Sequence, residues 1–141
     1  MRKTVLALVV LVLLLVYGCG DQQVFDASSE ETMQQSFEEM TQDMAEHEVE
    51  SLKEAISKAM LMDIIEFSRD YCQEYGELPE EAEELRQVDD LLELHKVHIL
   101  SADEATVHGM TLNEIHLETA GEELEKLEEE FGEVYEACVA E

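Results

Sequence analysis

The sequence predicts an all-α protein, a small bundle of three to four helices that follows an N-terminal signal peptide. Apolar residues recur at steps of three and four, which is the spacing of one helix face. Serine or threonine stands three residues before glutamate at several expected helix starts, which is the capping-box pattern. No stretch shows the apolar–polar alternation that is typical of a half-buried strand.

Residues 1–18 have the three parts of a secretory signal. Arg2 and Lys3 supply positive charge, an apolar run extends over residues 5–16, and Gly18 is a small residue directly before a cysteine. The run is shorter than the roughly 20 apolar residues of a membrane-spanning helix and fits the hydrophobic region of a signal. We therefore expect residues 1–18 to be removed.

The sequence Val16-Tyr17-Gly18-Cys19 resembles the lipobox of bacterial lipoprotein signals, in which the cysteine becomes lipidated and N-terminal. Two or three acyl chains such as palmitate would hold Cys19 stably at a membrane. An uncleaved anchor and a signal cut nearby are the alternatives. We expect a bacterial envelope lipoprotein on the periplasmic side. The outer membrane is favoured over the inner one because Gly20, and not aspartate, follows the cysteine.

The charge balance after the signal is strongly acidic. The chain has 36 acidic and eight basic residues, and two of the basic ones, Arg2 and Lys3, belong to the signal. The chain after the signal therefore contains six basic and 36 acidic residues, which gives it a formal net charge of −30. Such a charge excludes nucleic-acid binding, because phosphates would be repelled. It favours a cationic protein or peptide as partner, and the alternative is a solvated acidic surface suited to a saline habitat.

The first expected helix opens the helical domain, residues 28–141, after a lipidated cysteine and polar tether over residues 19–27. Ser28 and Glu31 form a capping box at its start. One apolar stripe follows, and it either packs in the core or forms an adaptable groove for a partner helix. The stripe consists of Met33, Phe37, Met40 and Met44.

Two further helices are expected in the middle of the chain. The helix over residues 48–74 is apolar around much of its girth, so we expect it to be the central, most buried element. Gly76 suits its left-handed C-terminal position, and Pro79 suits the first turn of a helix over residues 79–100.

The last helix begins at Thr111. Thr111 and Glu114 form a capping box, and Met110 and Ile115 form a hydrophobic staple. Apolar residues continue at steps of three and four to the C-terminal end, so we expect one long helix that packs inside the bundle, with a coiled-coil dimer as the alternative. They are Leu117, Ala120, Leu124, Leu127, Phe131, Val134 and Cys138.

Cys72 and Cys138 remain when Cys19 is assigned to the lipid. In an oxidising periplasm they are a disulfide candidate that would close a loop of about 66 residues. Two separate buried thiols are the alternative, because the sequence does not show whether their Cα atoms lie within about 7 Å.

Two stretches resemble an uncharacterised family of small bacterial lipoproteins, a domain of unknown function. One is the acidic-Ser-Ser-Glu-Glu start, Asp26-Ala27-Ser28-Ser29-Glu30-Glu31, with Ser36 and Met40 beyond it. The other is His108-Gly109-Met110-Thr111-Leu112-Asn113-Glu114-Ile115, a Gly-Met-Thr-x-x-Glu-Ile element. The resemblance implies a periplasmic lipoprotein and supplies no catalytic residues. The acidic stretch over residues 77–90 and the long acidic C-terminal helix depart from the family pattern.

The sequence contains no Gly-rich phosphate loop, nucleophile elbow, zinc-protease motif or calcium loop, so we expect no enzyme, no catalytic residue and no cofactor. His95 and His98 are candidate metal ligands at a spacing of three, although a histidine on an apolar stripe is more often a boundary residue. Met40, Met44 and His47 are candidate Cu(I) ligands, although methionines at helical spacing more often fill a core.

The expected function is a non-enzymatic interaction module for a cationic protein or peptide. The alternative is a divalent-cation binder, for which dense carboxylates supply the ligands but a straight helix presents them poorly. These carboxylates are Glu122, Glu123, Glu128, Glu129, Glu130 and Glu133.

Overall fold

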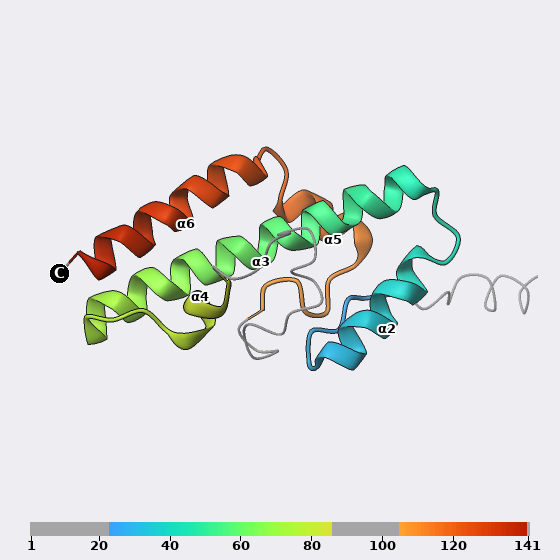
Figure 1. Ribbon diagram of the computed structural model, residues 1–141. Helices are drawn as coiled ribbons and strands as arrows, with labels where there is room; N and C mark the ends of the chain where they lie inside the picture. Colours follow the sequence, from blue (N-terminus) through green and yellow to red (C-terminus); the bar gives the residue numbers. More distant parts are fainter. Residues whose placement is uncertain (1–22, 86–104, 141) are drawn as a thin grey trace, which may run out of the picture.

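The computed structural model describes residues 23–85 and 105–140. This part of the chain is an all-α bundle (Figure 1), which confirms the predicted fold class. The signal peptide, Cys19, His95 and His98 lie outside the described residues. The helices are α2 (Glu30–Thr41), α3 (Glu46–Tyr75), α4 (Glu80–Leu85), α5 (Leu112–Glu118) and α6 (Leu124–Val139).

The long helix α3 is the centre of the bundle, as its sequence predicts. The oxygen Oε2 of Glu48 accepts the amide of Ala45 at 2.9 Å at its N-terminal end. Gly76 closes the other end with a φ of 73°, and its amide donates to the Cys72 carbonyl at 2.9 Å. Ten side chains of α3 are buried, more than on any other described helix. They are Leu52, Ala55, Ile56, Ser57, Ala59, Met60, Leu61, Ile64, Ile65 and Ser68.

Helix α2 begins one residue later than predicted. Both the amide and the hydroxyl of Ser28 donate to Oδ1 of Asp26, so Ser28 belongs to the preceding turn. Ser29 is the N-cap: its Oγ accepts the Thr32 amide at 3.1 Å, and Thr32 Oγ1 accepts the Ser29 amide at 2.9 Å. The expected box of Ser28 with Glu31 is therefore wrong, because a threonine hydroxyl takes the place of the glutamate.

The predicted C-terminal helix is interrupted by a turn between α5 and α6. Thr119 ends α5, with its hydroxyl donating to the Ile115 carbonyl at 3.2 Å, and Gly121 has a φ of 83°. The chain leaves the helix direction at this left-handed position, which glycine adopts readily. Leu117, expected on the buried seam, is 76% exposed as a result.

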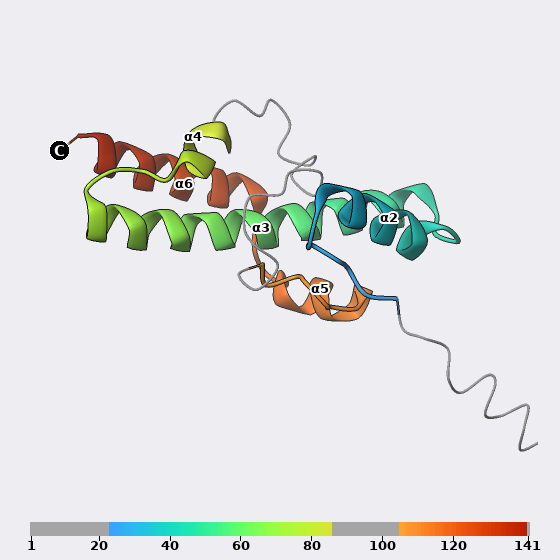
Figure 2. The ribbon, with the colours of Figure 1, turned by 90° about the horizontal axis from the view of Figure 1, so that it is seen from below.

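Helix α6 packs along α3, and the two run side by side in the same direction (Figures 1 and 2). Leu127, Phe131 and Cys138 are buried, and Leu124 and Val134 are partly buried against the core. The seam predicted for this part of the chain is therefore confirmed, within the bundle.

Helix α4 covers the first turns of the helix predicted over residues 79–100; the remainder of that range is not described from residue 86. Ala82 and Leu85 of α4 are buried in the core. Within residues 23–85 and 105–140, none of the helices combines the length and the apolar character needed to cross a bilayer.

Candidate functional site

The segment Val24–Ala27, here called the strap, is built into the domain. Its backbone pairs with the loop before α5: the Phe25 amide donates to the Met110 carbonyl at 2.9 Å, and the Gly109 amide donates to the Phe25 carbonyl at 2.8 Å. Val24 forms an isolated antiparallel bridge with Thr111. Phe25 and Ala27 are buried. The prediction of a polar tether through residue 27 is therefore wrong for the strap, because apolar side chains and non-local backbone hydrogen bonds hold it.

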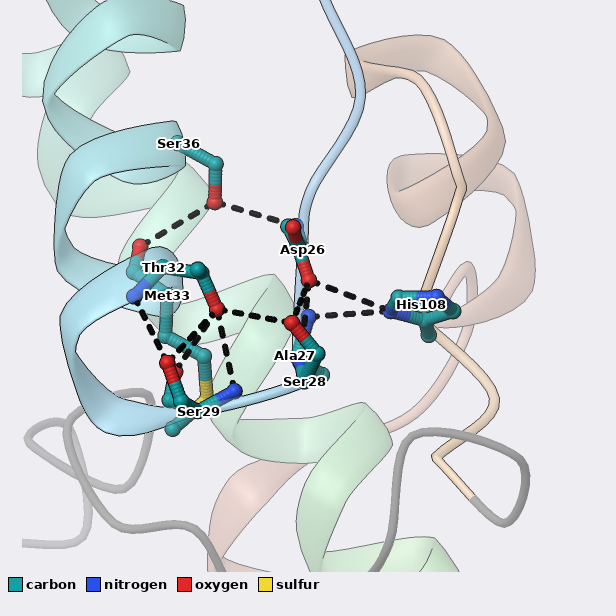
Figure 3. Close-up of polar contacts among 8 residues, drawn as sticks. All are labelled: Asp26, Ala27, Ser28, Ser29, Thr32, Met33, Ser36 and His108. Atoms are coloured by element: carbon teal, nitrogen blue, oxygen red, sulfur yellow. Dashed lines mark hydrogen bonds and ion pairs between the residues drawn. The ribbon is translucent and has the colours of Figure 1, made fainter.

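Polar side chains fasten the strap on both sides (Figure 3). His108 Nδ1 accepts the Ala27 amide at 3.0 Å and lies 3.7 Å from Asp26 Oδ1. On the other side, the Asp26 amide donates to Ser36 Oγ of α2 at 3.0 Å. Hydrogen bonds from the Ser28 hydroxyl and amide hold the pKa of Asp26 below its ordinary value.

This polar joint has serine and histidine side chains but does not form a nucleophile and base. The Ser36 hydroxyl donates to the Met33 carbonyl, and the Ser28 hydroxyl donates to Asp26. Neither hydroxyl gives its proton to His108, whose Nδ1 is occupied by a backbone amide. Nucleophilic catalysis needs a hydroxyl within hydrogen-bond reach of its base, so the contacts assign a structural role to the joint.

The joint brings together the two stretches on which the family resemblance rests. Asp26, Ala27 and Ser36 come from the first stretch and His108 from the second. Both stretches are also capping motifs, and the sequence does not predict this contact, which spans 81 residues. No local sequence pattern indicates this contact, because its partners lie 81 residues apart.

The capping box predicted at the start of α5 is confirmed. Glu114 Oε2 accepts the Thr111 amide at 2.7 Å, and Thr111 Oγ1 accepts the Glu114 amide at 3.4 Å. These bonds with Thr111 lower the pKa of Glu114. Because Thr111 also pairs with Val24, the box fixes the start of α5 beside the strap.

An acidic groove lies between α3, α5 and α6. Its volume is about 430 Å³, and six carboxylates and one guanidinium line it together with a few apolar side chains. Its lining residues are Met62, Asp63, Ile65, Glu66, Arg69, Asp70, Thr106, Glu118, Glu122, Leu127 and Glu130.

Asp63 is a half-buried carboxylate of the acidic groove. The Thr106 hydroxyl donates to Asp63 Oδ1 at 2.6 Å, and the Thr106 amide donates to Oδ2 at 2.9 Å. Burial raises the pKa of Asp63, the hydrogen bonds from Thr106 oppose this, and the charges of Glu66 and Glu118 add to the rise. The groove thus holds more negative charge than its own polar groups neutralise.

One ion pair joins two walls of the acidic groove. Arg69 Nη2 of α3 lies 2.8 Å from Glu130 Oε1 of α6, and both side chains are about half exposed. An exposed pair of this kind stabilises the fold little, about 0–1 kcal/mol. It shows that the carboxylates at this rim accept a guanidinium group.

Cys72 and Cys138 form a disulfide, with their Cα atoms 6.0 Å apart. It joins the C-terminal ends of α3 and α6, which run in the same direction. Of the two alternatives left open by the sequence, the structure has the disulfide. A second cavity of about 450 Å³ lies beside it, lined in part by Arg69, Gln73 and Val134.

The stripe offered as a partner groove is part of the core. Met33, Phe37 and Met40 are buried, and Met44 is partly buried against the same cluster. The partner-groove hypothesis for Met33, Phe37, Met40 and Met44 is therefore wrong, because these side chains belong to one core cluster with residues of α3 and the strap. Among residues 23–85 and 105–140, no three His, Cys, Asp or Glu side chains converge to hold a metal ion.

Residues 3–69 match a family model described as "Family of unknown function (DUF6694)". The matched segment includes the first resemblance stretch and ends within α3, before Cys72 and His108. No curated protein and no solved structure matches the chain. Over residues 3–69, the chain is therefore similar to a family that is itself uncharacterised.

Proposed function

We propose that this chain is a non-enzymatic, lipid-anchored envelope protein whose acidic groove binds a cationic protein or peptide. The observation that carries the proposal is the acidic groove, in which six carboxylates share one cavity with a single arginine. Clefts lined by one sign of charge concentrate ligands of the opposite sign. The formal net charge of the whole chain, −28, attracts the same class of partner over longer distances.

The composition of the acidic groove suits lysine and arginine side chains. Their aliphatic stems pack on apolar surface while the charged head reaches polar groups. Met62, Ile65 and Leu127 supply apolar surface in the groove, and Arg69 already pairs there with Glu130. A basic segment of a partner would make the same kind of contact with the remaining carboxylates.

The proposed lipid anchor is supported by the sequence around Cys19. A signal-length apolar run and Val16-Tyr17-Gly18-Cys19 support lipidation of Cys19, and Gly20 supports transfer to the outer membrane. The family match begins at residue 3 and so includes the leader. The proposal also includes the resemblance of this chain to small periplasmic lipoproteins.

The test is the affinity of the leaderless protein, residues 20–141, for a fluorescent lysine-rich peptide, measured by anisotropy at low salt. The groove variant carries Glu66→Gln, Glu118→Gln and Glu122→Gln, all at exposed positions. We expect it to bind about tenfold more weakly, because three partly exposed ion pairs contribute about 0.5 kcal/mol each.

The matched control removes the same charge from α2. Its substitutions are Glu31→Gln, Glu38→Gln and Glu39→Gln, also at exposed positions. We expect this control to keep the wild-type affinity within about twofold, because screening weakens charges more than about 10 Å away. Equal weakening in both variants, or displacement of the peptide by millimolar Ca²⁺ but not Mg²⁺, would contradict the proposal.

A further inference from the structure

The chain between the proposed lipid and the domain is short. Residues 20–23 separate Cys19 from Val24, and the Val24 backbone is bridged to Thr111. Five peptide steps reach at most about 18 Å, whereas the 30 residues of α3 extend over roughly 45 Å. A lipid on Cys19 therefore keeps the strap and the start of α5 close to the bilayer, and it places no such restraint on the far end of α3.

Two exposed apolar side chains lie at this tethered end. Val24 is 43% exposed beside the N-cap of α5, and Leu117 of α5 is 76% exposed. Ile115 is fully buried, and two helical residues turn the side chain by about 200°, so Leu117 points away from the core. Figure 2 shows α5 on one side of α3 and α6 on the other, with the first described residues beside α5.

We propose that the side of the domain that carries Val24, beside the start of α5, and Leu117, near the end of α5, rests on the phospholipid surface that carries the anchor. This inference rests on the proposed lipidation of Cys19. We infer a phospholipid surface as the partner because residues 20–23 are too few to let this face move far from the membrane that holds the lipid. The acyl chains supply the membrane affinity, and the short connection selects the side of the domain that meets the lipid.

The test uses the full-length lipoprotein, purified from bacterial membranes and placed in neutral phosphatidylcholine vesicles that contain nitroxide-labelled lipid. Leu117→Cys carries an environment-sensitive fluorophore, attached without reductant so that the disulfide stays closed. Val139→Cys is the matched control, since Val139 is 59% exposed at the C-terminal end of α6. We expect quenching at 117 to be at least about twofold stronger than at 139, because interfacial residues lie within roughly 10 Å of the headgroup boundary.

Vesicle flotation separates the two claims. Protein that does not float would contradict the lipid anchor itself. Protein that floats but is quenched equally at both positions, or more at 139, would contradict the membrane-facing surface alone. A flexible Gly/Ser insert between Gln22 and Gln23 is expected to reduce quenching at 117 to the level at 139 while flotation persists. Unchanged quenching at 117 would contradict the role of the short connection.

Discussion

The amide of Ala27 donates a hydrogen bond to Nδ1 of His108 at 3.0 Å, across 81 residues of sequence. This contact, with the backbone pairing of Phe25 to Gly109 and Met110, makes the strap an integral part of the domain. It joins the start of the described chain to the loop that positions α5. The position of the proposed anchor and the position of α5 are therefore linked.

His108→Ala removes the acceptor of the Ala27 amide. We expect it to lower the free energy of unfolding of residues 20–141 by about 1–2 kcal/mol, because Ala27 is buried and its amide loses its partner. Urea unfolding followed by circular dichroism measures the change. His47→Ala, at an exposed position on α3, is the control and should change stability by less than about 0.5 kcal/mol. Equal effects of the two substitutions would show that the strap contact contributes nothing.

Asp26 should make the fold sensitive to acid. Its folded pKa lies below the unfolded value of 3.8, because the Ser28 hydroxyl and amide hydrogen-bond to the carboxylate. Its stabilisation is therefore present above the unfolded pKa and is lost as the pH falls through the folded pKa. We expect wild type to lose more stability than Asp26→Asn between about pH 5 and pH 2.5. Parallel profiles in urea unfolding at each pH would contradict this role.

Asp63 should have the opposite effect to Asp26 on the pH dependence of stability. Burial raises its folded pKa, so ionisation at neutral pH opposes folding, and this cost disappears as the pH falls below the unfolded pKa. Asp63→Asn keeps one acceptor for the Thr106 amide and can donate to its hydroxyl. We expect a higher melting temperature than wild type at pH 7 and a difference that shrinks towards pH 3. A melting temperature at pH 7 below that of wild type would contradict the burial of an uncompensated charge in the groove.

Local features of this fold could be predicted from the sequence. The buried stripe of α3, the seam of α6, the end of α3 at Gly76 and the box at Thr111 all depend on neighbours within a few residues. The features that were missed depend on distant contacts. Phe25 and Ala27 form too short an apolar segment to show periodicity, and their partners lie more than 80 residues away.

Distant contacts also explain why the break before α6 and the acidic groove could not be predicted from the sequence. Apolar residues keep a helical spacing through residues 119–123, so the pattern favours one helix, while Gly121 and the packing of α5 on α3 select a turn. The groove carboxylates are spread among many others in the sequence. They come together because α5 and α6 both pack against α3, an arrangement that no local pattern specifies.

The disulfide should stabilise two helices of like charge. Both α3 and α6 carry an excess of acidic residues, and Cys72–Cys138 joins their ends. We expect reduction, or Cys72→Ser with Cys138→Ser, to lower the free energy of unfolding by about 2–4 kcal/mol, because the bridge closes a loop of 66 residues. Added NaCl should restore part of this loss by screening the repulsion. A loss below about 0.5 kcal/mol in urea unfolding would contradict the stabilising role.

The central claim is that the acidic groove, and not the acidic surface in general, receives a cationic partner. Amide chemical-shift mapping of ¹⁵N-labelled residues 20–141, titrated with a lysine-rich peptide at low salt, tests it most directly. We predict saturable shifts concentrated at Asp63, Glu66, Thr106, Glu118 and Glu122, with little change along α2. Small, non-saturating shifts spread evenly over α2, α3 and α6 would contradict the claim.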